Sequence, residues 1–191
     1  MKWNNHKDLE DKHAVFSPSQ PFWLKYSDEK AIDFFENMKA KERGTELHDW
    51  AQKTINLKIR QSRAKKTLYM YVNDCIDIFK IDSDAKTERT LKYSDNFFGT
   101  ADFISFKNGY LRIYDLKTGI TPAHMEQLLI YAALFCLEYS IDPMDISIEL
   151  RIYQKDECIV HNPSPMDIRD ISKRIIQIDN ILTQNKGGLI Q

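Results

Sequence analysis

Residues 99–119 read GTADFISFKNGYLRIYDLKTG, two apolar runs joined by an Asn-Gly pair. Asn-Gly between alternating apolar residues is the strongest short-range signal for a β-hairpin with a two-residue type I′ loop. With this pair as the loop, Asp102 falls opposite Asp115, and Lys117 lies two residues further along the second strand. Because side chains alternate between the faces of a strand, we expect all three to share one face with the apolar side chains of the hairpin. Those apolar residues are Ile104, Phe106, Leu111 and Ile113.

Two carboxylates at directly opposed strand positions need compensation. Their Cβ atoms are expected to lie about 4.5–5.5 Å apart, a distance at which like charges destabilise the pairing. A divalent cation would supply the missing charge, since hard ions such as Mg²⁺ prefer carboxylate oxygens. Three other interpretations stay open: one aspartate is protonated, Lys117 neutralises the pair, or the hairpin end is frayed and both acids are solvated.

The remaining pattern predicts an α/β fold with a mixed central sheet and helices on its faces. Gly44 is expected to separate the first two helices, while Thr121 and Pro122 have the residue types preferred at a helix start. The expected helices cover residues 27–41, 45–55, 121–139 and 168–182. Besides the hairpin, the expected strands cover residues 67–81, 87–93 and 145–154. We expect one domain over residues 1–191, with an irregular lead-in at 1–20 and a flexible tail at 185–191.

Composition narrows the class of protein. The chain of 191 residues is 42% hydrophobic, enough for one real core, and its formal charge of −1 gives no global basic character. Three scattered cysteines favour a reducing compartment and provide no disulfide framework. No signal-peptide core and no apolar run of about 20 residues is present, so a cytoplasmic protein without membrane association is expected.

Positive charge gathers in KIRQSRAKK at residues 58–66, a stretch without an acidic residue. A solvated helix end and loop is one interpretation of this stretch. The other is a nucleic-acid contact, in which Arg63, Lys65 and Lys66 bind phosphates and make binding weaken with salt.

Four short motifs resemble, in the expected order, those of the PD-(D/E)XK nuclease superfamily, in particular its RecB-like branch. They are Gly44-Thr45-Glu46-Leu47-His48, Gly99-Thr100-Ala101-Asp102, Asp115-Leu116-Lys117, and Gln127 with Tyr131. The branch more often has Glu where this chain has Asp115, although Asp lies within the motif. Some of its members bind an iron–sulfur cluster through four cysteines. This chain has three, so no cluster is expected.

The resemblance implies a restriction-endonuclease-like core and a role for each motif residue. Asp102, Asp115, the backbone carbonyl of Leu116 and the imidazole of His48 would bind one or two Mg²⁺ or Mn²⁺ ions. Lys117 would act on the attacking water and on the phosphate. Gln127 and Tyr131, which are neighbours on one helix face, would position the lysine or the nucleic-acid backbone. Without the resemblance, His48 would be read as a packing residue and the Gln127/Tyr131 pair as a polar stripe.

By this resemblance the chain is expected to be a metal-dependent deoxyribonuclease that cuts single- or double-stranded DNA. An exonuclease in DNA end processing or recombination is favoured because no separate sequence-reading domain is visible. The small size is similar to that of phage exonucleases, and the resemblance is compatible with a homo-oligomer or with a recombination partner protein. The alternatives are a structure-specific endonuclease and a non-cutting nucleic-acid-binding or regulatory protein on the same fold. Against the last of these stands the intact set of Asp102, Asp115 and Lys117.

Overall fold

The computed structural model describes residues 24–187. The chain divides into two compact units, residues 1–46 and 47–191, which are described separately. Within residues 24–187, all the strands lie in the second unit. Our expectation of a single domain stays a prediction, and the lead-in expected at residues 1–20 lies outside the described residues.

Five strands form one mixed sheet in the order β1-β2-β3-β4-β5. Strands β3 and β4 run parallel, and the other neighbouring pairs run antiparallel. The strands are β1 (Lys86–Lys92), β2 (Phe98–Lys107), β3 (Tyr110–Leu116), β4 (Ser147–Gln154) and β5 (Glu157–His161). The helices are α1 (Asp28–Asn56), α2 (Thr67–Ile81), α3 (Glu126–Glu138) and α4 (Pro165–Gly187), with a short 3₁₀ turn, η3 (Pro143–Asp145).

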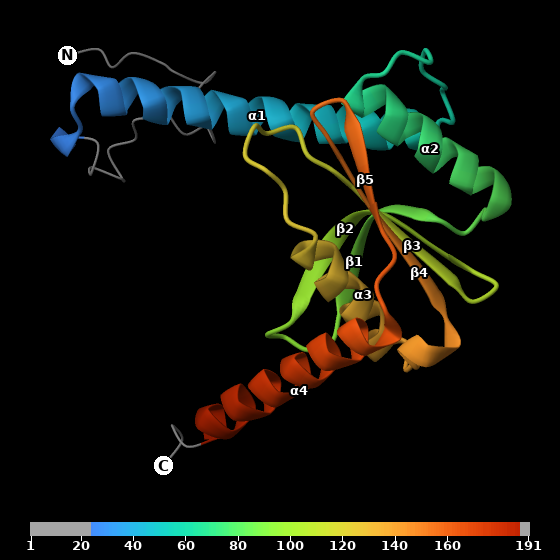
Figure 1. Cartoon of the computed structure of the whole chain (residues 1–191). Helices are drawn as coiled ribbons and strands as arrows, with labels where there is room; N and C mark the ends of the chain where they lie inside the picture. Colours follow the sequence, from blue (N-terminus) through green and yellow to red (C-terminus); the bar gives the residue numbers. More distant parts are fainter. Residues whose placement is uncertain (1–23, 188–191) are drawn as a thin grey trace, which may run out of the picture. The chain divides into compact units, whose positions relative to one another are not determined.

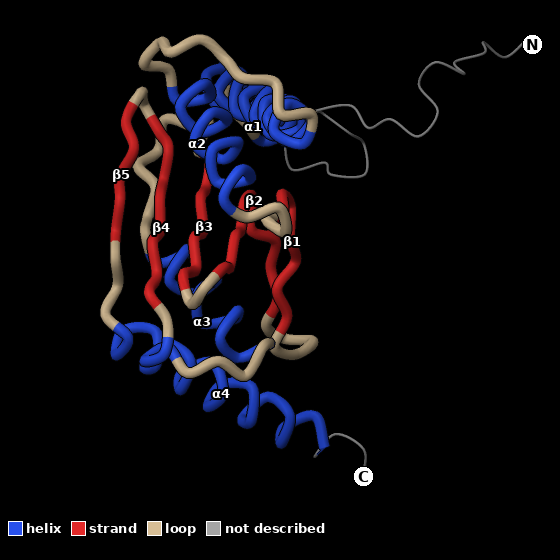
Figure 2. Tube along the Cα trace, turned by 90° about the vertical axis from the view of Figure 1, so that its right-hand side faces the viewer, coloured by secondary structure: helices blue, strands red, loops and turns tan. Residues whose placement is uncertain are grey.

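Helices cover both faces of the sheet (Figures 1 and 2). Helix α2 and the last turns of α1 pack on one face around buried Ile55, Val72 and Tyr153. Helices α3 and α4 pack on the other face around Leu111, Leu128 and other apolar side chains. The predicted α/β class, with a mixed sheet flanked by helices, is therefore confirmed.

The Asn-Gly hairpin is confirmed, although its ladder ends one position before the expected pairing of Asp102 with Asp115. Asn108 and Gly109 both have positive φ, 53° and 72°, as a type I′ loop requires. The ladder pairs Ile104 with Ile113 and continues as far as Phe103 with Tyr114. A pair of ordinary turn residues therefore fixes the register that brings the two strand ends together.

The expected strand at residues 67–81 is wrong, because this segment forms helix α2. Its content of Val, Ile and aromatic residues is typical of strands. However, Tyr71, Val72, Cys75 and Ile76 are all buried, a spacing of one, three and one residues that only a helix places on a single face.

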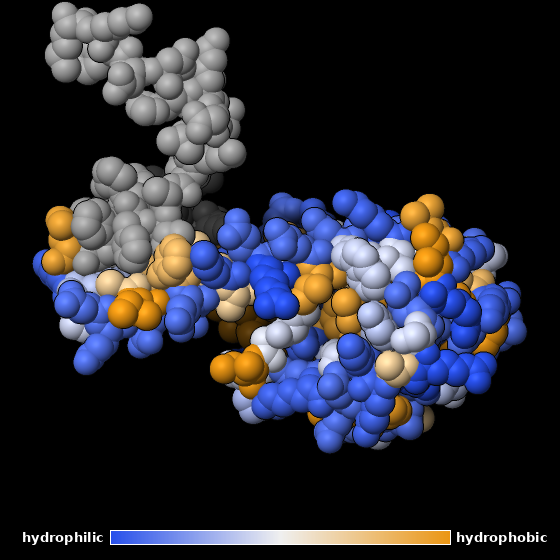
Figure 3. Space-filling model, turned by 90° about the horizontal axis from the view of Figure 1, so that it is seen from above, coloured by the Kyte–Doolittle hydropathy of each residue, from blue (hydrophilic) through white to orange (hydrophobic). Residues whose placement is uncertain are grey.

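The expected break at Gly44 is also wrong, because α1 continues from Asp28 to Asn56. Among the described residues, Gly109 is the glycine with positive φ, so Gly44 keeps a helical backbone. A glycine inside a helix costs about 1 kcal/mol relative to alanine without ending the helix. In the first unit, Leu24, Ile32 and Phe35 are exposed, and hydrophobic surface is visible over the start of α1 in Figure 3.

Helix α3 begins at Glu126, five residues after the predicted cap at Thr121. The side chain of Gln154 at the end of β4 explains the delay. Its Nε2 donates to the carbonyls of Gly119 and Thr121, both at 2.7 Å, and its Oε1 accepts from the amide of Ala123 at 3.1 Å. The side-chain amide of a residue distant in sequence thus holds the segment before α3 in a non-helical conformation.

The other expected elements agree more closely with the structure. Strands β1 and β4 and helix α4 lie where the sequence predicts them, while β5 was not predicted. Helix α4 continues through Gly187, three residues into the expected flexible tail, and residues 188–191 lie outside the described residues. Within the described residues, none of the helices has the length and apolar character needed to cross a membrane.

Candidate active site

Strands β1 and β2 are both distorted at the level of Glu88 and Asp102. Pairing skips these two residues, although it keeps the same register on either side of them. Glu88 has a positive φ of 49°. Ala101 and Ile104 pack in the same core cluster, which strict alternation along a straight strand would forbid. The distortion re-aims the side chain between them, a function that irregularities in strands often serve near active sites.

The expectation that Asp102 shares one face with Ile104 is therefore corrected. Alternation fails at Asp102, whose Oδ2 turns toward the end of β3 and accepts a hydrogen bond from the Leu116 amide at 2.9 Å. The same oxygen lies 3.4 Å from Nδ1 of His48 on α1. Asp102 thus links the middle of β2 and the end of β3 to the helix that carries the histidine.

His48, Glu88 and Asp102 form a carboxylate–histidine group that could hold a metal ion. Each offers one ligand atom, and these atoms all lie within 4.8 Å of one another. His48 and Asp102 are partly buried and Glu88 is exposed. No motif in the sequence identifies Glu88, because only the β1–β2 register places it at the level of Asp102. Predicting that β1 pairs with β2 in this register would have identified Glu88 as a site residue.

Electrostatics in this group favour a bound cation. Burial and the nearby Asp115 carboxylate raise the pKa of Asp102 from 3.8 to about 7, against the opposing hydrogen bond from Leu116. Burial and the charges of Asp49 and Asp115 raise the pKa of Glu88. The pKa of His48 is lowered, mainly by burial, so its imidazole is the neutral form that a metal needs. The negative charges are thus incompletely compensated by the protein.

Asp115 lies outside the carboxylate–histidine group but carries a second feature that suits a cation ligand. Its side chain is almost fully buried at 2% exposure, and among the described residues no donor forms a hydrogen bond to Oδ2. The Lys117 ammonium lies 3.0 Å from that oxygen without hydrogen-bond geometry and donates to Oδ1 at 3.2 Å. A buried carboxylate oxygen without a donor suits a metal ligand, so the residues present fit a divalent ion.

Lys117, Gln127 and Tyr131 form a hydrogen-bonded chain that we call the lysine relay. Lys117 Nζ donates to Gln127 Oε1 at 2.9 Å, and Gln127 Nε2 donates to the Tyr131 hydroxyl at 3.3 Å. The hydroxyl donates in turn to the backbone carbonyl of Thr100 at 2.7 Å. The relay anchors the lysine to the strand that carries Asp102.

Gly99 leaves room for the tyrosine of this relay. A Cβ atom at residue 99 would lie 2.9 Å from Cε1 of Tyr131, closer than real contacts allow. The glycine in the Gly99–Asp102 motif is therefore needed for close approach between β2 and α3, and not for an unusual backbone conformation.

The structure brings together most of the site residues expected from the sequence. His48 and Asp102 meet directly, while Asp115, Lys117, Gln127 and Tyr131 are connected by the contacts above. The Leu116 amide is used by Asp102, and a hydrogen bond to the Leu116 backbone raises the pKa of His48, opposing the effect of burial. Whether the Leu116 carbonyl binds an ion stays a prediction.

A cavity of about 280 Å³ opens beside Lys117. Its lining combines apolar side chains with two lysines and the start of α2. The lining residues are Leu47, Thr67, Leu68, Leu116, Lys117, Thr118, Gly119, Ile120 and Lys155. The cavity gives the lysine relay access to a ligand from solvent.

The basic residues expected to contact nucleic acid are exposed in the segment between α1 and α2. Lys66 directly precedes α2, and Lys65 and Lys66 help to lower the pKa of Asp156. Asp156 binds the amide of Thr67, which lines the cavity beside Lys117. Lys65 and Lys66 therefore lie near that cavity, while Arg63 has no such link in the described residues.

No protein-family model matches the chain, and no curated protein matches its sequence. The chemistry of the site must therefore be inferred from its residues.

Proposed function

We propose that the chain is a metal-dependent nuclease, similar to the RecB-like branch of the PD-(D/E)XK superfamily, that hydrolyses phosphodiester bonds in DNA. The observation that carries the proposal is the carboxylate–histidine group next to an ion pair of buried Asp115 with partly exposed Lys117 at the end of β3. A protein that only binds nucleic acid has no need of carboxylates whose charges repel one another.

His48, Glu88, Asp102 and Asp115 would hold the metal, with the Leu116 carbonyl as a further oxygen donor. Three carboxylates and one imidazole suit Mn²⁺ as well as Mg²⁺. When bound, a divalent cation would lower the pKa of a water molecule and withdraw charge from a phosphate oxygen. The protein's contribution is to gather these carboxylates at one place and to keep the imidazole neutral.

Lys117 would orient the attacking water and stabilise the negative charge that develops on the phosphate. Its ammonium is held between Asp115 and Gln127, at 3.0 Å and 2.9 Å, and its side chain is 30% exposed toward solvent. Gln127 and Tyr131 are positioning residues in this proposal, because they act through the lysine. Fixed geometry of this kind lowers the barrier by avoiding reorganisation during the reaction.

The proposed substrate is single- or double-stranded DNA bound across the cavity beside Lys117, with phosphates also contacting Arg63, Lys65 and Lys66. By the same resemblance we propose an exonuclease that acts in DNA end processing and recombination. The proposed setting is a phage-like recombination system in the cytoplasm, with or without a partner protein or a homo-oligomeric assembly.

Cleavage of end-labelled linear DNA tests the proposal. Single- and double-stranded substrates are incubated with Mg²⁺ or Mn²⁺ and with wild type, Asp115→Asn or Lys117→Ala. Wild type should degrade at least one substrate, and both variants should be slower by about 10²-fold to 10³-fold, the effect of removing one group that stabilises the transition state. The direction of label loss gives the polarity.

The exposed α4 pair Asp170 and Lys173 provides matched controls, because Asp170→Asn and Lys173→Ala make the same chemical changes away from the site. Both should cleave at the wild-type rate. Uncut substrates with either metal, in the presence of specific DNA binding, would instead support the non-cutting alternative. Internal cuts at junctions or flaps would support a structure-specific endonuclease.

A further inference from the structure

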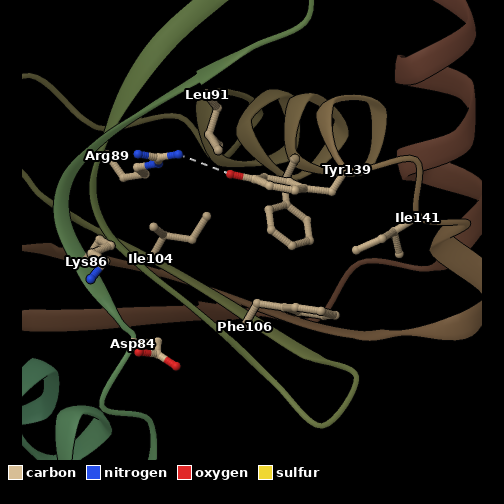
Figure 4. A pocket seen from close by; sticks show the side chains of 9 residues that line it. Asp84, Lys86, Arg89, Leu91, Ile104, Phe106, Tyr139 and Ile141 are labelled. Atoms are coloured by element: carbon tan, nitrogen blue, oxygen red, sulfur yellow. Dashed lines mark hydrogen bonds between the residues drawn. The ribbon is translucent and has the colours of Figure 1, made fainter.

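A second cavity, of about 590 Å³, opens between the β1–β2 strands and the C-terminal half of α3 (Figure 4). Its buried floor is apolar, with Leu91, Ile104 and Phe135 all at or below 6% exposure. Phe106 and Tyr139 form more exposed walls, at 37% and 45%. The volume lies within the range of about 300–1,000 Å³ that is usual for sites of small organic ligands.

Three aromatic rings form a continuous wall in this cavity. The rings of Phe106 and Phe135 have centroids 5.0 Å apart, and those of Phe135 and Tyr139 are 4.9 Å apart. Figure 4 shows Tyr139 and Phe106 on opposite sides of the hollow, with Ile141 beside them. A planar apolar group would bury its faces against such a wall and gain stacking energy.

Two cations stand at the β1 rim of the same cavity. Arg89 donates a hydrogen bond to the Tyr139 hydroxyl at 3.2 Å, which holds its guanidinium at the mouth, and Lys86 lies on the same strand. The two residues are about 10 Å apart along the strand, at roughly 3.3 Å per residue. Asp84 is the acidic lining residue and could accept a hydrogen bond from an amino group. The rim therefore suits a ligand with an apolar planar part and more than one negative charge.

The cavity and the carboxylate–histidine group share the β1–β2 strands. Glu88 lies between Lys86 and Arg89 in β1, and it belongs to the candidate metal site while Lys86 and Arg89 line the cavity. Gln127, Tyr131 and Phe135 on α3, and Tyr139 at its C-terminal cap, follow one another at intervals of four residues. From Tyr131 to Phe135 the helix rises about 6 Å, at 1.5 Å per residue. A strand of nucleic acid at the candidate active site could therefore reach this cavity.

We propose that the cavity binds an unpaired base of single-stranded DNA, with the flanking phosphates held by Lys86 and Arg89. This inference rests on the proposed function for the nature of the ligand. Stacking of bases on aromatic side chains beside basic residues is the usual way in which proteins hold single strands without reading their sequence. A peptide side chain could fill the apolar floor but would leave the two cations without phosphate partners.

Binding to a labelled oligothymidylate in EDTA tests the proposal without cleavage. A strand of the same length built from abasic sugar-phosphate units measures the contribution of the bases. Wild type should bind the oligothymidylate more tightly than the abasic strand. Phe106→Leu, which keeps an apolar side chain but removes the ring, should weaken oligothymidylate binding by roughly 5-fold to 100-fold and leave abasic binding unchanged.

Arg89→Ala should weaken binding of both the oligothymidylate and the abasic strand. It should also reduce the slope of log affinity against log salt by about 0.7, the value for one phosphate on a single strand. Lys173→Ala, an exposed α4 lysine, removes the same charge elsewhere and should leave both affinities at the wild-type values. Thermal unfolding of each variant verifies that it is folded.

Equal affinity of wild type for the two strands, or unchanged oligothymidylate binding by folded Phe106→Leu, would overturn the proposal and leave an apolar peptide side chain as the candidate occupant. Failure of the proposed function has a different signature. If base-dependent binding is present but no DNA is cut with Mg²⁺ or Mn²⁺, the cavity assignment stands and the nuclease assignment falls.

Discussion

The carboxylate–histidine group and the lysine relay lie at the same hairpin end but differ in how their polar atoms are satisfied. In the relay, each donor from Lys117 through Tyr131 meets an acceptor, and the chain ends on the Thr100 carbonyl. In the carboxylate–histidine group, acids are gathered around a neutral histidine, and the pKa of Asp102 rises to about 7. The relay's hydrogen bonds are made within the protein, whereas the acids of the group repel one another and suit a cation.

This difference separates two tasks. A satisfied hydrogen-bonded chain fixes geometry, and removing one member should loosen the lysine without changing the charge at the group. Carboxylates held close together store an electrostatic penalty that a cation relieves. Substitutions that change metal affinity without changing the lysine's position, or the reverse, can therefore test whether the two tasks are separate.

The largest effect is expected from exchanging Asp102 for asparagine. Because outer partners of metal ligands already account for about 10-fold to 100-fold in affinity, Asp102→Asn should weaken Mn²⁺ binding by about 100-fold or more. Lys117→Ala should keep Mn²⁺ affinity within about 3-fold of wild type while cleavage falls by about 10³-fold. Isothermal titration and a DNA cleavage assay measure the two quantities. Loss of Mn²⁺ binding in Lys117→Ala would show that metal binding and positioning of the lysine are not separate tasks.

The pH dependence of stability in EDTA comes next. Folding raises the pKa of Asp102 from 3.8 to about 7, so between these values the folded protein holds a proton that the unfolded chain has released. The free energy of unfolding should therefore fall as pH rises through this window. At 1.36 kcal/mol per unit the loss is at most about 4 kcal/mol, reduced by the coupling of Asp102 to its acidic neighbours.

Urea unfolding of wild type and Asp102→Asn from about pH 4.5 to pH 8 measures this effect. In Asp102→Asn, most of the decrease in unfolding free energy with rising pH should be absent. At the higher pH, saturating Mn²⁺ should stabilise the wild-type protein but not the variant. If the unfolding free energies of the two proteins change with pH in parallel, Asp102 is not the source of the charge penalty.

Gly99→Ala should displace the Tyr131 ring and so disturb the lysine relay. The new methyl group would meet the Tyr131 ring at 2.9 Å, and overpacking of this kind costs about 1–3 kcal/mol of stability. Gly119→Ala is the matched control, because no described atom lies within 4 Å of a Cβ at that position and its φ is not positive. Urea midpoints that shift equally in both variants would show that close approach of β2 and α3 is not the cause.

The smallest effect is expected from Tyr131→Phe. This change removes the hydroxyl that donates to the Thr100 carbonyl, which should cost about 1 kcal/mol of stability and slow cleavage with little change in Mn²⁺ affinity. Tyr69→Phe on α2 removes the same atom outside the relay and should leave cleavage unchanged. A changed Mn²⁺ affinity in Tyr131→Phe would place the tyrosine with the carboxylate–histidine group instead.

Local chemistry made the hairpin predictable from the sequence. Asn108 and Gly109 determine the turn, the turn determines the register, and the register brings Asp102 toward the Asp115 end of β3. The i, i+4 spacing of Gln127 and Tyr131 likewise needed only helix geometry, and both residues join one hydrogen-bonded chain. These parts depend on contacts between residues near in sequence.

Features that depend on distant partners were missed. Glu88 joins the site because β1 pairs with β2 and both strands are distorted at one level. The start of α3 is delayed by Gln154, which reaches back 33 residues to bind the Thr121 carbonyl. Segment 67–81 carries strand-forming residues, and its helical state follows from burial of one face against the sheet. Intrinsic preference was overridden by packing in this case.

The Nδ1 atom of His48 and the carboxylate of Asp102 lie 3.4 Å apart in space, although the two residues are 54 positions apart in the sequence. An ion bound by both would close a long chain loop, whose entropy in the unfolded state is worth about 3.5 kcal/mol by the logarithmic loop-length rule. The cation would then also act as a removable cross-link. Amide hydrogen exchange in the last turns of α1 should slow when Mn²⁺ is added and recover when it is chelated.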